Sequence, residues 1–187
     1  VSSTSYSYHG GVCGYSYQGC VFDSCTNTAA VAGSSYTGGI TGYAYYYTKF
    51  ENCTNTGSVT STSRNVGGIV GYWYPNTSVT SVRMYNCTNR GSVTGTYYTG
   101  GMVGYAYYYA KFFNCKNYGN VSSTSYGIGG IAGYHYYYGI MENCENYGNV
   151  SGSYYVAGLA GYEYVGSSTA SYRVYNCKNE GNVSGTS

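Results

Sequence analysis

Few side chains in this sequence could carry out chemistry: eight cysteines, six carboxylates and two histidines among 187 residues. Polysaccharide cleavage requires paired carboxylates or a metal with a nearby base. The two histidines do not recur near a cysteine, since His135 stands between two tyrosines and His9 lies in a glycine-rich segment. A cysteine nucleophile would therefore have no recurring base.

The cysteines form no C-x-x-C pair, and only two histidines could assist them. We therefore expect no zinc or iron–sulfur site and no other metal or cofactor. An even number of cysteines in a Ser/Thr/Asn-rich chain favours an oxidising compartment. The sequence thus predicts an extracellular or cell-surface protein.

Composition excludes several other classes. The formal net charge is +2, only 7% of residues are charged and no Lys/Arg run occurs, so nucleic acid is not an expected partner. No stretch of 18 apolar residues is present, so no membrane span is expected, and the start at Val1 is typical of a mature or excised piece. With 30 glycines, 31 tyrosines and many β-branched residues, the chain favours an all-β fold.

A repeat organises the whole chain. The signature G-Y-x-Y recurs six times at spacings of 28, 29, 33, 29 and 28 residues, with first tyrosines at Tyr15, Tyr43, Tyr72, Tyr105, Tyr134 and Tyr162. The third and sixth copies carry an insertion before their cysteine, which indicates duplication of a three-copy unit. Such periods are typical of solenoids. We predict one domain, 1–187, a parallel β-helix-like solenoid of about six coils in two units, about 1–92 and 93–187, without capping repeats.

Each copy contains three apolar patches, as in "GGIVGYWY", "VRMYNC" and "GSVTGT", and these predict three short strands per coil. Two positions stay apolar in every copy and are expected in the core. The first set is Val12, Ile40, Ile69, Met102, Ile131 and Leu159; the second is Phe22, Phe50, Met84, Phe112, Met141 and Val174. A valine ladder comprises Val1, Val31, Val59, Val93, Val121, Val150 and Val183.

Asparagine and cysteine form two further columns. The asparagines, expected to bond one another and the turn backbone as a structural ladder, are Asn27, Asn55, Asn89, Asn117, Asn146 and Asn179. The cysteines are Cys25, Cys53, Cys87, Cys115, Cys144 and Cys177. Adjacent coils lie about 4.8 Å apart, within the Cα separation that disulfides accept. Pairs 25–53, 87–115 and 144–177, or stacked free thiols, are equally expected, and Cys13 and Cys20 could also bridge each other.

The tyrosines are predicted to divide into two groups. Tyr105 and Tyr107 have a tyrosine at each equivalent, whereas the residue between them varies among Ser16, Ala44, Trp73, Ala106, His135 and Glu163. We interpret the variable position as facing water and the flanking tyrosines as packed inside, with Gly104 as a bulge. The tyrosines of the following loop, expected as an exposed contact surface, are Tyr46, Tyr47, Tyr108, Tyr109, Tyr137 and Tyr138.

The carboxylates do not form a predicted catalytic site. Asp23, Glu51 and Glu142 share one repeat position, at which other copies have an aromatic residue, and this is typical of a tolerant surface site. Glu142 and Glu145 could lie near each other, yet solvation explains both. We expect no enzyme activity and no catalytic residue. Among the N-x-S/T sequences, Asn76 in the first insertion is the expected glycosylation position.

The segments "NCKNYGNVSSTSYGIGGIAGY" and "NCENYGNVSGSYYVAGLAGY" resemble the GLUG-motif repeats of large bacterial surface and secreted proteins. The G-L-x-G core of that motif corresponds to 158–161, and to 68–71 in another copy. The resemblance implies a stalk or adhesin-like module with a passive extracellular role.

Two functions follow as hypotheses. The first is a segment or subunit of a surface fibre or stalk whose partner is itself, because Val1 and Val183 belong to the same ladder and the two ends therefore look complementary. The alternative is an adhesin-type module whose exposed tyrosine rows contact glycans or other surfaces.

Overall fold

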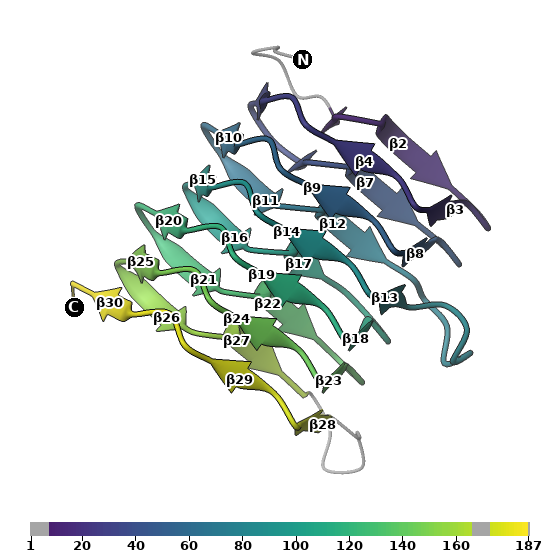
Figure 1. Cartoon of the computed structure of the whole chain (residues 1–187). Coiled ribbons are helices and arrows are strands. Elements are labelled where there is room, and N and C mark those ends of the chain that lie inside the picture. Colours follow the sequence, from purple (N-terminus) through teal and green to yellow (C-terminus); the bar gives the residue numbers. More distant parts are fainter. Residues whose placement is uncertain (1–7, 166–172, 187) are drawn as a thin grey trace.

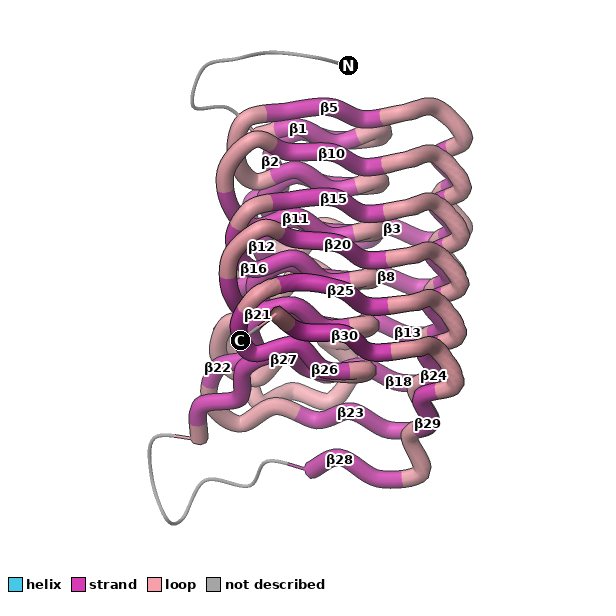
Figure 2. Tube along the Cα trace, turned by 90° about the vertical axis from the view of Figure 1, so that its left-hand side faces the viewer, coloured by secondary structure: helices cyan, strands magenta, loops and turns pink. Residues whose placement is uncertain are grey.

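The computed structural model describes residues 8–165 and 173–186, which form strands and turns without a helix. The chain winds as a parallel β-solenoid in which each strand pairs with its equivalent one coil earlier and one coil later (Figures 1 and 2). The paired strands are in register, so that Tyr72 lies beside Tyr43 and Tyr105. The fold class predicted from the repeat, an all-β solenoid of about six coils, is confirmed.

Each coil contributes one strand to each of five six-stranded sheets. The glycine sheet contains β1 His9–Gly10, β6 Thr37–Gly38, β11 Arg64–Gly67, β16 Tyr97–Gly100, β21 Tyr126–Gly129 and β26 Tyr154–Ala157. The tyrosine sheet contains β2 Cys13–Tyr17, β7 Thr41–Tyr45, β12 Val70–Tyr74, β17 Val103–Ala106, β22 Ala132–Tyr136 and β27 Ala160–Tyr164. The phenylalanine sheet contains β3 Val21–Asp23, β8 Lys49–Glu51, β13 Met84–Tyr85, β18 Lys111–Phe113, β23 Ile140–Glu142 and β28 Arg173–Tyr175.

The two remaining sheets complete the coil. The asparagine sheet contains β4 Thr26–Asn27, β9 Thr54–Asn55, β14 Thr88–Asn89, β19 Lys116–Asn117, β24 Glu145–Asn146 and β29 Lys178–Asn179. The valine sheet contains β5 Val31–Gly33, β10 Val59–Ser61, β15 Val93–Gly95, β20 Val121–Ser123, β25 Val150–Gly152 and β30 Val183–Gly185. Pairing continues from Val59 to Val93, so it runs without a break across the expected boundary between the two units.

The structure has five strands in a coil where the apolar patches predicted three. The patch "GGIVGYWY" includes the last residue of β11, a corner at Gly68 and Ile69, and all of β12. Strand β14 consists of Thr88 and Asn89 and therefore contains no apolar residue at all. Each apolar patch marks a segment whose side chains point into the core. Strands also form at the corners, where polar residues pair with the next coil, and these strands leave no apolar patch.

The core divides into a large cluster between the tyrosine and phenylalanine sheets and small valine clusters between the glycine and valine sheets. Ile40, Ile69, Met102 and Ile131 are fully buried, as their repeat position predicts. The terminal members of the same ladder differ, because Val12 is 48% exposed and Leu159 is only partly buried.

The prediction that the variable residue between the tyrosines faces water is wrong. Trp73, Ala106 and His135 are at most 1% exposed, whereas Tyr105 lies half-buried on the outside. Simple alternation from Met102 places Ala106 inside and Tyr105 outside, so Gly104 does not reset the phase of the strand.

Local compensation explains why a buried position accepts such different residues. Trp73 lies between Ala44 and Ala106 of the neighbouring coils, and its indole N–H donates to the Thr48 carbonyl at 3.0 Å. A Cβ added at Gly139 would overlap the ring of His135, so the absence of a side chain there makes room for the imidazole. The residue at this position can vary between copies because neighbouring residues change size to compensate, and not because the position faces water.

Candidate functional site

The six asparagines of the repeat stack in one column, which is buried from Asn27 to Asn146 and exposed at Asn179. The side-chain amide of Asn117 donates to the Asn146 Oδ1 and to the Gly119 carbonyl, both at 2.8 Å, and accepts from Asn89 at 2.8 Å. The same two donations recur along the column from Asn27 to Asn146. A Cβ added at Gly101 would overlap the Asn117 side chain, so the glycine corner packs directly on the amides. The interior amides are saturated and covered, which leaves no room for a ligand on them.

The cysteines of the column are free thiols in this structure, as are Cys13 and Cys20. The Cys53 Sγ lies 3.3 Å from the carbonyl oxygens of both Glu51 and Phe22, and its single proton can be donated to either. Burial raises the pKa of the Cys87 thiol well above its usual value, so this sulfur stays protonated. The interior thiols pack as small apolar groups, whereas Cys25 and Cys177 in the end coils are partly exposed.

Tyrosine rings form continuous rows on the outside of the tyrosine sheet. The rings of Tyr105 and Tyr134 stack with centroids 4.6 Å apart, those of Tyr134 and Tyr162 at 4.8 Å, and those of Tyr107 and Tyr136 at 4.8 Å. Burial raises the pKa of Tyr134 to about 12, so its phenol is neutral in ordinary buffers. Because each face is covered by the ring in the next coil, the row presents ring edges and hydroxyl groups to a partner.

The six loop tyrosines expected as a contact surface lie beside this sheet. Tyr47 is 47% exposed, while the other five are half-buried. The rings of Tyr108 and Tyr137 stack at 5.0 Å and those of Tyr109 and Tyr138 at 4.9 Å. All six have positive φ, a conformation that bulky residues adopt only at a cost of about 1–3 kcal/mol. Glycine or asparagine would adopt this conformation at lower cost, so the stability of the fold alone would favour those residues at these loop positions.

The first insertion follows β12 and is held by a buried lysine. The Lys111 ammonium, whose residue is 4% exposed, donates to the carbonyls of Ser78 at 2.6 Å and Val79 at 2.9 Å. Asn76, the expected glycosylation position, is half-buried with a φ of 49°. The repeat position of Lys111 is also basic in Lys49, Arg83 and Arg173 and apolar in Val21 and Ile140, so nothing in the sequence marks Lys111 as the residue that holds the insertion.

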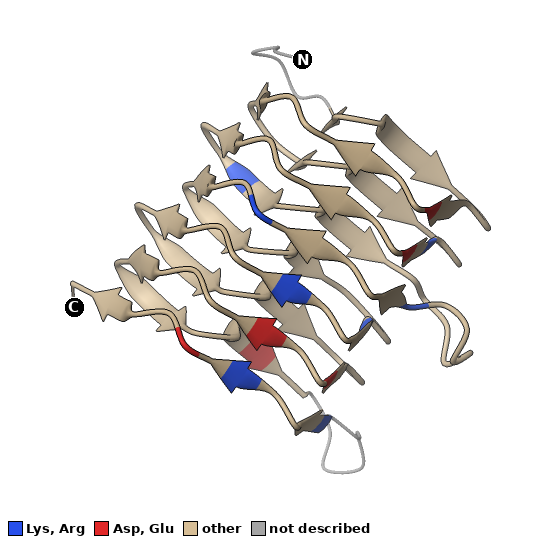
Figure 3. Ribbon diagram, in the orientation of Figure 1, with Lys and Arg blue, Asp and Glu red and all other residues tan. Residues whose placement is uncertain are grey.

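Charged residues gather on one side of the molecule (Figure 3). All but two of them, Arg64 and Glu163, belong to the phenylalanine and asparagine sheets or the turns next to these sheets. Glu163 belongs to the tyrosine sheet but takes the inward-facing position beside His135, whose Nδ1 lies 3.6 Å from its Oε1, so the outer face of that sheet carries no charge.

The carboxylates considered as a pair have separate partners. Glu142 accepts a hydrogen bond from the Tyr175 hydroxyl, whereas Glu145 accepts from Tyr147 at 2.6 Å and pairs with Lys116 at 2.9 Å. Within residues 8–165 and 173–186, no group of three His, Cys, Asp or Glu side chains could hold a metal ion.

Both ends of the solenoid are open in the part of the chain that the structure describes. Strands β1 to β5 form the outer edges of the five sheets at one end, and β26 to β30 form them at the other. At the second end a hollow of about 380 Å³ is lined by side chains that include Met141, Leu159 and Val174. Val1, expected to continue the valine ladder, lies outside the described residues.

Comparisons with known proteins agree with this geometry. The fold defines a parallel β-solenoid repeat protein, and the family model of the GLUG motif matches residues 33–60, which confirms the resemblance predicted from other copies. A candidate immunoglobulin A1 protease from Bacteroides ovatus has a similar solved structure, with a TM-score of 0.67 and 22% sequence identity. The match covers 95% of this chain and 56% of that chain, so this chain spans about half the length of that structure.

A search of curated proteins found none similar to this sequence. Among the described residues, no helix has the length and apolarity needed to cross a membrane.

Proposed function

We propose that this protein is a non-enzymatic segment of an extracellular surface fibre or stalk, and that its solenoid stacks end to end with further copies of the same repeat. The observation that carries the proposal is the pair of open ends. Among the described residues, five strand edges at each end have no neighbouring strand on their outer side, and a hollow lies beside Leu159. Edges of this kind template pairing with another chain.

The polarity of the asparagine ladder supports head-to-tail stacking. Each interior amide donates both to a carbonyl two residues on and to the oxygen of the next asparagine. At one end, Asn179 donates to the Gly181 carbonyl at 2.8 Å, and its second N–H has no acceptor within residues 8–165 and 173–186. At the other end, the Asn27 Oδ1 accepts from the Ala29 N–H at 3.3 Å and has a further lone pair. A second copy in the same orientation would continue the ladder.

The extracellular and non-enzymatic parts of the proposal have separate support. The GLUG motif at residues 33–60 fits the surface and secreted proteins that the sequence resembles. The carboxylates of the phenylalanine and asparagine sheets are engaged by neighbouring side chains rather than arranged as an acid–base pair.

Charged substitutions at the two ends test the stacking. In the isolated chain, Val12 is 48% exposed and Leu159 partly buried, so V12D and L159D place charges where a second copy would dock. We expect the wild-type chain to associate with increasing concentration in sedimentation velocity and the double variant to remain monomeric. Val79, 52% exposed in the first insertion, provides a control as V79D, which should associate like the wild type. Association that is unchanged in the double variant would refute end-to-end stacking.

The uncharged tyrosine face favours a second candidate, an adhesin-type contact with glycans or other surfaces. The stacked rings offer hydroxyl groups and ring edges rather than open faces, so contact would be made by hydrogen bonds along the rows. Replacing Tyr108 and Tyr137 by phenylalanine removes these hydroxyls and keeps the stack. We expect the double variant to lose binding on a glycan array, and an array with no signal for the wild type would reject this candidate.

A further inference from the structure

A groove on the charged side of the solenoid has the composition of a ligand site. It lies where the first insertion meets β13, has a volume of about 260 Å³, and extends over three successive coils of the phenylalanine sheet. The side chains that matter for its chemistry are Arg83, Tyr85, Phe113, Asn114, Glu142 and Asn143. None of these residues belongs to the tyrosine rows or to the open ends.

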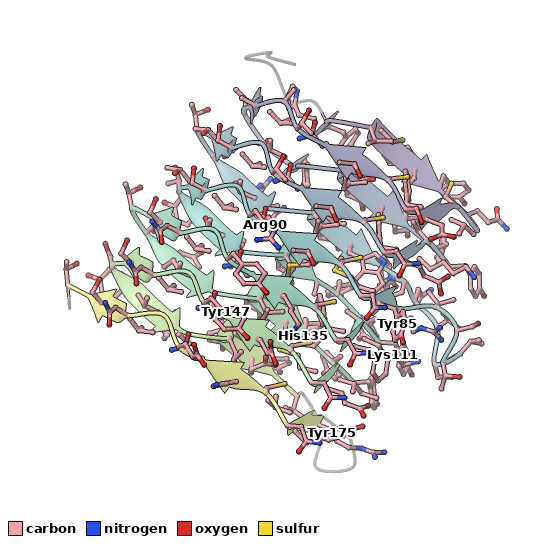
Figure 4. The ribbon with its side chains drawn as sticks, viewed as in Figure 1. Tyr85, Arg90, Lys111, His135, Tyr147 and Tyr175 are labelled. Atoms are coloured by element: carbon pink, nitrogen blue, oxygen red, sulfur yellow. The ribbon has the colours of Figure 1, made fainter. Side chains whose placement is uncertain are left out.

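Neighbouring side chains hold the charged groups of the groove in place. The Arg83 guanidinium lies over the ring of Tyr85, 5.0 Å from its centroid, and its Nη2 is 3.4 Å from the Glu51 Oε1. Glu142 accepts a hydrogen bond from the Tyr175 hydroxyl of the following coil. Figure 4 shows Tyr85 and Tyr175 on the same side of the solenoid, near the end of the coil where the first insertion lies.

The aromatic rings of this groove are arranged differently from those of the tyrosine rows. Tyr85 pairs in register with Glu51 on one side and Phe113 on the other, and Phe113 pairs in turn with Glu142. The carboxylates of Glu51 and Glu142 therefore lie on either side of the aromatic pair Tyr85 and Phe113 along the sheet. An aromatic ring beside a carboxylate and side-chain amides can bind a ligand that is partly apolar and partly hydroxylated: the ring packs against its apolar part and the polar groups bond its hydroxyls. The stacked rings of the tyrosine rows cannot do this with their faces, because the neighbouring rings cover them.

We propose that this groove binds a neutral saccharide unit. Sugar hydroxyl groups can donate to Glu142 and to the amide oxygens of Asn114 and Asn143, and can accept from the guanidinium of Arg83. The C–H face of the sugar packs against Phe113. Both signs of charge are present, so neither a strongly anionic nor a strongly cationic ligand is favoured. The volume lies below the range of about 300–1,000 Å³ typical of drug-sized ligands, which suits a single sugar ring.

The key element of the groove occurs once in each three-coil unit. Arg-x-Tyr follows the first insertion at 83–85 and the second at 173–175, whereas no other copy has an arginine or a tyrosine at these two positions. Equivalent positions three coils apart are separated by about 14 Å along the solenoid at about 4.8 Å for each coil. A longer array of these repeats would thus present saccharide sites at regular intervals and gain avidity. Binding of a saccharide in the groove beside the first insertion does not depend on end-to-end stacking.

The proposal can be tested by NMR titration of the full chain with the methyl glycosides of glucose, galactose, mannose and N-acetylglucosamine. We expect saturable binding of at least one of them. Replacing Glu142 by glutamine removes the charged acceptor and should weaken that binding about tenfold, because hydrogen bonds to charged groups are the stronger ones. Phe113→Ala should also weaken it. Asp23→Asn is the matched control, since Asp23 occupies the same position of the repeat outside the groove and should leave binding unchanged.

Two results would overturn the proposal. One is the absence of binding to all four glycosides, and the other is binding that is equal in the wild type and E142Q. Circular dichroism and thermal melting check that each variant is folded. Should F113A unfold, E142Q still decides the question, because Glu142 is a half-buried surface residue whose replacement keeps its shape. Loss of binding in Y108F/Y137F but not in E142Q would place the saccharide on the stacked loop tyrosines and would reject the groove as its site.

Discussion

Removing one interior asparagine should destabilise the solenoid far more than removing the last one. In Asn117→Ala, the chain loses the donations of Asn117 to Gly119 and Asn146 and its acceptance from Asn89, each at 2.8 Å. Because the site is fully buried, the N–H of Asn89, the carbonyl of Gly119 and the Oδ1 of Asn146 each lose a hydrogen-bond partner that water cannot readily replace.

The size of the effect follows from these three bonds. A net contribution of about 1 kcal/mol for each bond, with a further penalty for the buried groups that lose their partners, gives about 3–5 kcal/mol. Small domains have total stabilities of about 5–15 kcal/mol, so this loss should be obvious. Asn179→Ala is the matched control, because the same side chain at the exposed end donates to Gly181 and accepts from Asn146 where water can replace it. Its cost should be about 1 kcal/mol or less.

Urea denaturation followed by circular dichroism measures both variants against the wild type. We expect a large fall in the midpoint for N117A and a small one for N179A, with similar slopes. Equal effects of the two substitutions would refute this reasoning, since the cost is expected from burial of the ladder and not from the loss of an asparagine side chain as such.

Three further predictions concern the core, the tyrosine rows and the thiols. Trp73→Ala should cost about 3–5 kcal/mol in the same urea assay, because the indole is fully buried, and a change below about 1 kcal/mol would mean that the side chain faces water. The pKa of Tyr134 is raised from 10.0 to about 12, so its contribution to stability is fully present below pH 10 and is lost as the pH rises from 10 to 12. Thermal melting across that range should show a falling midpoint, and Tyr134→Phe should reduce the fall; an identical slope in the variant would contradict this. With a thiol reagent, the partly exposed Cys13, Cys20, Cys25 and Cys177 should react in the native protein and the other four only after unfolding, whereas native protein without reactive thiols would indicate disulfides.

The repeat made the solenoid and its columns predictable. A period near 30 residues with fixed apolar positions requires coils that stack in register, so Ile69 and Met102 could be assigned to the core from sequence alone. The asparagines that bond the turn backbone could also be assigned, because an asparagine that precedes a glycine in every later copy is most simply explained by a turn. These features could be predicted because they are the same in every copy of the repeat.

Other features could not be predicted, because they depend on differences between copies. Trp73 and His135 are buried by the small residues beside them, a compensation that is visible only when neighbouring coils are placed in contact. The saccharide groove draws on three coils and an insertion, so its residues are scattered over 60 positions of the sequence between Arg83 and Asn143. The two-residue strands of the asparagine sheet, such as Thr88–Asn89, leave no apolar signal.

Electron microscopy of the purified chain over a range of concentrations tests end-to-end stacking most directly. Six coils at about 4.8 Å each give about 29 Å for one chain, so a stack should appear as an unbranched filament one solenoid wide whose length rises with concentration. We predict such filaments for the wild type and their absence in V12D/L159D. Particles of single-chain size at every concentration would contradict the account.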